Sequence, residues 1–210
     1  MNIECHPLGP FETNSYLLLP DNDDSALVVD VPPGAWPYYQ KLLAGRKRRC
    51  AAVWLTHGHW DHMADIGHFQ SAGIPVLAHR GDGDWIERPE LMLPFTPPGT
   101  ELHGATPTRW VDQGDELAFG GYTFEVRHVP GHSPGGVVFY APELEMVLGG
   151  DALFLGGVGR FDLPGGDGPL LFQKIKEQLF TLPPATRVLP GHGPVTTIER
   201  EMKHNPYVHA

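Results

Sequence analysis

The chain has 210 residues, of which 41% are hydrophobic and 19% are charged, a balance typical of a globular protein with a buried core. Its formal net charge of −10 argues against a nucleic acid or an anionic membrane surface as the main partner. No apolar run approaches the roughly 20 residues of a membrane-spanning helix, which excludes a transmembrane protein.

The N-terminus lacks the basic and apolar regions of a secretory signal peptide. Residues 1–21 instead predict a pair of strands, and the polar turn DNDD leads from NSYLLLP (14–20) into a further strand, SALVVDVP (25–32). Cys5 and Cys50 have no metal-ligand spacing, and we expect them to be small core side chains in a reduced compartment. These features predict a cytoplasmic protein.

The rest of the first half alternates predicted helices and strands. AWPYYQKLLAG (35–45) predicts a helix with Tyr39, Leu42 and Leu43 on one face. It is followed by a strand (51–56), a helix (62–73) and another strand (74–78). The Pro- and Gly-rich residues 81–107 then predict a long connector with one or two helical turns. This connector lines a cleft or covers it as a lid. Trp85, Met92 and Phe95 are either exposed, for an apolar substrate or a dimer contact, or part of the core under the loop.

The second half begins with a predicted hairpin, residues 116–129, around two glycines. Strands are predicted at 136–141, 145–150 and 186–190, and helices at 168–183 and 196–206. No linker separates the two halves. The whole pattern predicts one domain, residues 1–210, of the mixed α/β (α+β) class, with two sheets and helices outside them.

Four predicted strand ends carry metal-ligating side chains beside glycine. They lie in the segments LTHGHWDH, VPGHSPG, LGGDALF and LPGHGP, and the candidate ligands are His57, His59, Asp61, His62, His132, Asp151 and His192. Five imidazoles and two carboxylates are about what two ions sharing one carboxylate need. A lone histidine near a turn is usually structural, but three histidines and an aspartate within six residues have no common structural purpose.

These segments resemble the H-x-H-x-D-H motif of the metallo-β-lactamase superfamily, which a distant His, Asp and His complete. The resemblance covers nearly the whole chain, and it implies a four-layer αββα sandwich with the metals at one edge. It also implies one metal site at His57, His59 and His132, a second at Asp61, His62 and His192, and Asp151 as the bridge between them.

Within that superfamily, GGVGRFDLPGGD (156–167), LPGHGPVTTI (189–198) and NPYV (205–208) resemble the short bacterial type II glyoxalases of the YcbL type. These are hydroxyacylglutathione hydrolases, so the resemblance implies hydrolysis of a thioester such as S-D-lactoylglutathione. Arg160 matches a position that binds the glutathione carboxylate in the longer enzymes, whereas Asp162 stands where they have tyrosine. The alternative role for Arg160 is an ion pair with Asp162 that braces the loop. Only 18 residues follow His192, so we expect no C-terminal glutathione-binding helical domain.

The ligand set contains no thiolate, so it suits zinc, iron or manganese and does not choose among them. We expect two divalent ions, zinc in the first place, with iron or manganese as the alternatives. Two such ions would lower the pKa of a bridging water, and the resulting hydroxide would attack the substrate carbonyl. We expect Asp61 to ligate a metal and also to orient this hydroxide or accept its proton. Because no general acid is evident beside the ligands, a thiolate leaving group with a parent pKa of about 8.5 is favoured over an amine.

Four other functions stay open at this point. A mononuclear iron persulfide dioxygenase shares the fold and most ligands, although RFDLPGGD (160–167) favours the glyoxalase group. A β-lactamase is disfavoured by the lack of an export signal, and a ribonuclease by the acidic charge. A metal-stabilised binding module without activity is disfavoured by the complete ligand set. The expected partner is a small-molecule thioester, and the sequence allows a monomer or a homodimer.

Overall fold

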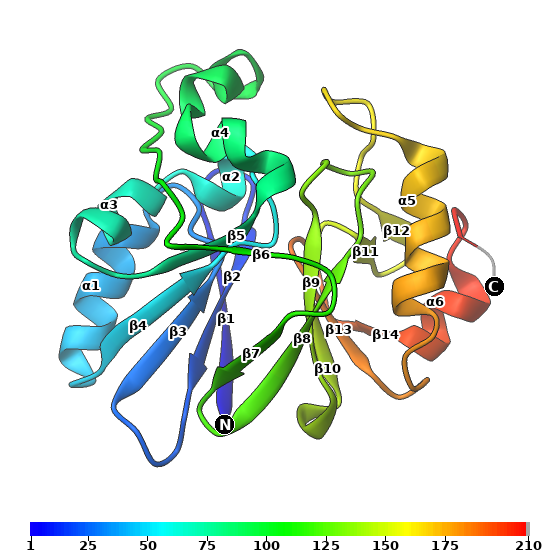
Figure 1. The fold of residues 1–210 in the computed structure, drawn as a ribbon, viewed down its shortest axis with the longest axis horizontal. Helices are drawn as coiled ribbons and strands as arrows, with labels where there is room; N and C mark the ends of the chain where they lie inside the picture. The colour runs from blue at the N-terminus through cyan, green and yellow to red at the C-terminus, as the bar shows by residue number, and fades with distance from the viewer. Residues whose placement is uncertain (209–210) are drawn as a thin grey trace.

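The computed structural model describes residues 1–208, which form two six-stranded sheets packed face to face (Figure 1). The first sheet has the order β1 (Asn2–Leu8), β2 (Thr13–Leu19), β3 (Ser25–Val29), β4 (Arg49–Trp54), β5 (Val76–His79) and β6 (Arg109–Val111). The second has the order β14 (Thr196–Thr197), β13 (Arg187–Pro190), β10 (Met146–Gly150), β9 (Val137–Ala141), β8 (Tyr122–His128) and β7 (Glu116–Phe119). A small hairpin of β11 (Leu153–Phe154) and β12 (Gly157–Val158) follows β10.

Helices cover the outer faces of both sheets, as Figure 1 shows. On the side of the first sheet lie α1 (Ala35–Gly45), α2 (Trp60–Met63), α3 (Ile66–Ser71) and α4 (Gly83–Glu87), with the short turns η1 (Arg80–Asp82) and η2 (Pro89–Phe95). On the side of the second sheet lie α5 (Gly168–Lys174), the π-helical turn η4 (Ile175–Leu179) and α6 (Ile198–His204). The turn η3 (Pro142–Leu144) joins β9 to β10. This arrangement confirms the expected αββα sandwich.

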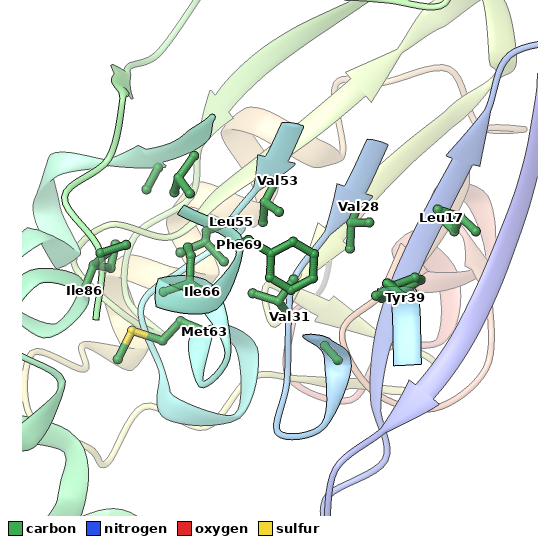
Figure 2. Close-up of a cluster of buried hydrophobic side chains, with 14 of the residues drawn as sticks. Leu17, Val28, Val31, Tyr39, Val53, Leu55, Met63, Ile66, Phe69 and Ile86 are labelled. Carbon is green, nitrogen blue, oxygen red and sulfur yellow. The ribbon is translucent and has the colours of Figure 1, made fainter. Parts of the chain in front are cut away.

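Strands β2 and β3 and the last two residues of β4 are buried on both faces, because alternate side chains point into two different cores. Leu17, Val28 and Val53 pack against the helices, in the cluster shown in Figure 2. Their neighbours Leu18 and Trp54 point the other way, into the core between the two sheets. This two-sided burial holds the strand ends rigidly, and the candidate ligands follow directly after them.

The single helix predicted for residues 62–73 is wrong, because the chain forms two short helices there. α2 ends at Met63 and α3 begins at Ile66. Between them, the backbone N–H of Asp65 donates to the Val31 carbonyl at 3.1 Å, and its carboxylate accepts from the Trp36 N–H at 2.8 Å. These contacts with a distant segment replace the regular helical hydrogen bonds.

Of the two interpretations of the connector side chains, the structure places Met92 in the core under the loop at 2% exposure, leaves Trp85 half-buried and exposes Phe95. One prediction of burial needs correction. Cys5 is exposed instead of being a core residue, because β1 is an edge strand with one face open to solvent. No helix within residues 1–208 is long and apolar enough to cross a membrane.

The predicted domain spans residues 1–210, whereas the structure describes residues 1–208. His209 and Ala210 lie outside the described residues. Within residues 1–208, the two sheets share one interior core that includes Tyr16 and Phe139. We therefore keep a single domain as our proposal for the chain.

Candidate metal centre

The four ligand-bearing segments meet at one edge of the sandwich. His57 and His59 lie in the loop after β4, and Asp61 and His62 lie in α2, which follows that loop. The loops after β8, β10 and β13 bring the remaining three candidates, which are His132, Asp151 and His192. The structure thus brings together all seven predicted ligands, and each sheet contributes some of them.

Three of the buried histidines form a first group, with His132 at its centre. Its Nε2 atom lies 2.8 Å from His59 Nδ1 and 3.1 Å from His57 Nε2. All three side chains are at most 5% exposed. A group of three imidazole nitrogens this close together is a typical metal-binding arrangement.

A second group consists of Asp61, His62 and His192. Asp61 Oδ2 lies 3.2 Å from His192 Nε2 and 3.7 Å from His62 Nε2. Asp151 lies between the two groups. Its Oδ1 atom is 3.3 Å from His62 Nε2, and its Oδ2 atom is 3.6 Å from both His132 Nε2 and His192 Nε2.

The outer nitrogens of four histidines all face hydrogen-bond acceptors, which sets the tautomer of each ring. The Thr56 hydroxyl donates to Asp30 at 2.7 Å, so it accepts from His57 Nδ1, which lies 3.1 Å away. The other three acceptors are Asp30 Oδ2 at 2.8 Å from His62 Nδ1, the Arg160 carbonyl at 2.6 Å from His132 Nδ1, and the Phe11 carbonyl at 3.2 Å from His192 Nδ1. In a neutral imidazole, a proton on Nδ1 leaves a lone pair on Nε2.

These tautomers direct the Nε2 lone pairs toward one another. His57 and His132 face each other at 3.1 Å, and His62 and His192 at 3.4 Å. Two lone pairs at such distances cannot form a hydrogen bond, whereas a cation between them would bind both. The donor set and its outer hydrogen bonds therefore fit divalent metal ions.

The electrostatics of the two groups differ. Burial and the neighbouring imidazoles lower the pKa of His57 well below its usual value and that of His59 to about 3. Burial also lowers the pKa of His62, but the carboxylates around it, Asp151 first, raise it by more, so its pKa lies above the usual value. The pKa of His192 is likewise raised, because the hydrogen bond to Asp61 and nearby Asp151 outweigh burial.

Several residues that support the candidate ligands were not predicted. Asp30 binds both Thr56 and His62, and it follows a strand in LVVDV much as Asp151 does in LGGDA, so the same sequence signal could have found it. Thr13 donates to Asp61 Oδ2 at 3.1 Å, and nothing in its local sequence indicates this role.

A cavity of about 460 Å³ opens onto the candidate ligands. Its walls are mostly aromatic and aliphatic, formed by Phe11, Trp60, Phe95, Phe154 and Leu163. Arg160 lines it too, but its guanidinium forms two hydrogen bonds with Asp162, at 2.8 and 3.0 Å. Both side chains of this pair are more than 60% exposed.

Comparison with known proteins agrees with this geometry. Residues 8–192 match the sequence profile of the Metallo-beta-lactamase superfamily. The chain belongs to the metallo-beta-lactamase superfamily. A superfamily relative in Bacillus subtilis, named probable metallo-hydrolase YqgX, is 34% identical over 96% of this chain and 95% of its own length. Hydroxyacylglutathione hydrolase GloC of Haemophilus influenzae is 32% identical over 100% of this chain and 99% of its own length.

Two solved structures resemble the chain over nearly its whole length. The BLEG-1 B3 metallo-beta-lactamase covers the whole of both chains with a TM-score of 0.89 and 36% identity. The protein TTHA1623, solved in a di-iron-bound form, has a TM-score of 0.84 and 37% identity over 98% of this chain and all of its own. The chain is therefore a metal-dependent hydrolase of this superfamily.

Proposed function

We propose that this superfamily member is a dinuclear metallohydrolase that cleaves thioesters such as S-D-lactoylglutathione. His57, His59 and His132 would hold the first metal, Asp61, His62 and His192 the second, and Asp151 would contact both. The observation that carries the proposal is the pair of facing Nε2 atoms at each site, 3.1 Å apart between His57 and His132 and 3.4 Å apart between His62 and His192, which a cation between them would bind together. The likeness to GloC over nearly its full length supports the choice of substrate.

When bound, two divalent ions would acidify a water molecule and stabilise the negative charge that develops on the substrate carbonyl oxygen. Asp61 would orient that water. Its carboxylate is held by the Thr13 hydroxyl at 3.1 Å, and His62 and His192 keep its pKa below the usual value although burial opposes them. A carboxylate with a low pKa accepts a hydrogen bond well but retains a proton poorly, which suits an orienting role.

The walls of the cavity favour a substrate with an apolar part next to the reacting carbonyl. Arg160 is the one arginine or lysine that lines the cavity within residues 1–208, and it would contact a carboxylate of the thiol half. Such a contact requires displacement of Asp162. Because both side chains are exposed and water screens their charges, this exchange costs little.

Hydrolysis of S-D-lactoylglutathione by the zinc-loaded protein tests the proposal. We expect turnover, and we expect Asp151→Ala to lose most bound metal and to lower kcat/KM by roughly 10³-fold, which corresponds to about 4 kcal/mol of transition-state stabilisation. Asp84→Ala is the control, because this carboxylate is exposed and pairs only with Arg88. Full activity of the Asp151 variant with two bound metals would contradict the bridging role.

Two other reactions are measured with the same purified chain. A β-lactam is included because the BLEG-1 structure is that of a metallo-beta-lactamase at 36% identity. Oxygen uptake with glutathione persulfide by the iron-loaded protein tests the mononuclear persulfide dioxygenase. Faster turnover of either one than of the thioester would reject our choice of substrate and leave the metal site as proposed.

A further inference from the structure

Asp82 is a buried carboxylate outside the candidate ligand set. It ends the turn η1, at the start of the connector, and is only 2% exposed. Its Oδ2 atom accepts hydrogen bonds from the Gly58 N–H at 2.7 Å and from the Ser133 hydroxyl at 2.8 Å. Its Oδ1 atom accepts from the Gly135 N–H at 2.6 Å. One side chain thus joins two loops that lie 75 residues apart in the sequence.

Both loops carry candidate ligands of the first metal. Gly58 stands between His57 and His59, and Ser133 directly follows His132. We propose that Asp82 is a positioning residue that holds these two loops together and thereby sets the geometry of the first metal site. This inference rests on the ligand assignment proposed above.

The packing around Asp82 leaves no room for a side chain at Gly58 or Gly135. A Cβ atom added at Gly58 would lie 2.7 Å from Asp82 Cβ, and one at Gly135 would lie 2.6 Å from the Asp82 nitrogen. Real Cβ atoms essentially never approach other atoms so closely. The glycines of THGH and HSPG therefore allow the backbones to reach the carboxylate.

The second metal site has different supports. His62 donates to Asp30 at 2.8 Å, and Thr13 donates to Asp61 at 3.1 Å. Neither contact involves Asp82. A change at Asp82 should therefore weaken the first site selectively.

Asp82→Asn has the same shape but only one acceptor atom in place of two. Whichever way the amide is turned, its NH₂ group meets a backbone N–H, either that of Gly58 or that of Gly135. One buried donor then has no acceptor, and the two loops are no longer held in register. We expect the affinity of the first site for zinc to fall about 10-fold or more, as is typical for residues that support metal ligands.

The test measures zinc per chain at equilibrium with a chelator, together with hydrogen exchange of the Gly58 and Gly135 amides in the metal-free protein. We expect Asp82→Asn to lose one zinc at a chelator concentration that leaves both on the unchanged protein. We also expect it to lose protection at the Gly58 amide or the Gly135 amide, whichever faces the NH₂ group. Asp84→Asn is the matched control, because the same change two residues away affects only an exposed pair with Arg88.

Either of two results would overturn the inference. The first is that Asp82→Asn binds two zinc ions with unchanged affinity, and the second is that both sites are weakened equally. If Asp82→Asn does not fold, Ser133→Ala decides. We expect it to weaken the first site selectively by about 3-fold or more, and unchanged affinity of the first site or equal weakening of both sites would contradict the inference. A wild-type chain that binds fewer than two zinc ions would instead contradict the ligand assignment itself, and the inference with it.

Discussion

His57 and His59 are neutral at physiological pH, because burial and neighbouring imidazoles lower their pKa values. His62 and His192 sit among carboxylates, which raise their pKa values in spite of burial. A metal ion must displace any proton from the nitrogen that it binds. The two proposed metal sites therefore differ in how strongly protons compete with the metal.

We expect the second metal to be released first as the pH falls from 8 to 5. His62 and His192 have pKa values above the usual 6.5, so protons already compete there near neutral pH. His59, with a pKa of about 3, gains no proton in this range. Zinc per chain at each pH, with a fixed chelator, should pass through a plateau at one. The His192→Ala variant, whose second site is impaired, serves as the reference for deciding which zinc is lost. Release of the zinc at the first site before the zinc at the second site would contradict this prediction.

At the scale of single elements, the small hairpin β11–β12 acts on the candidate ligands through its backbone. Gly159 follows β12, and the carbonyl of the next residue, Arg160, accepts from His132 Nδ1 at 2.6 Å. A Cβ atom at Gly159 would lie 2.7 Å from His132 Nδ1 and would overlap the Asp151 carbonyl oxygen. The hairpin can orient His132 only because this position carries no side chain.

Gly159→Ala should therefore weaken zinc binding at the first site about 10-fold or more and destabilise the fold by about 1–3 kcal/mol. Zinc titration and urea unfolding measure the two effects. Gly157→Ala in the same hairpin is the control, because a Cβ atom there would make only an ordinary contact at 3.7 Å with Phe154. Equal zinc affinity in the two variants would show that the close contact has no effect on His132.

At the scale of the whole molecule, each proposed metal joins the two sheets. The first would connect the loop after β4 in the first sheet to the loop after β8 in the second. The second would connect α2, which follows β4, to the loop after β13. Because an unfolded chain cannot present these ligands together, metal binding should stabilise the folded sandwich.

Removal of the metals should therefore lower Tm. At a free zinc concentration 100-fold above Kd, each ion contributes about 2.7 kcal/mol. For a chain of this size, 1 kcal/mol shifts Tm by about 2–4 °C, so we expect a decrease of about 5–11 °C per ion. Scanning calorimetry with and without chelator measures it, and Asp151→Ala should show a much smaller difference. An identical Tm in both conditions would mean that the metals do not bridge the sheets.

Local sequence patterns were sufficient for most of the elements, but not for the division between α2 and α3, and they were sufficient for recognising the candidate ligands. Helix α1 spans the predicted residues 35–45, because its apolar spacing and terminal glycine are local features. The HGHWDH motif could be recognised because four candidate ligands lie within six residues. The tertiary structure alone decided what surrounds them. Asp82 binds Gly58, which lies 24 residues away in the sequence, and Gly135, which lies 53 residues away. Asp65 follows the end of α2 and is held by hydrogen bonds with Val31 and Trp36. Buried carboxylates act through whichever N–H and O–H groups the fold brings to them, and no local pattern contains that information.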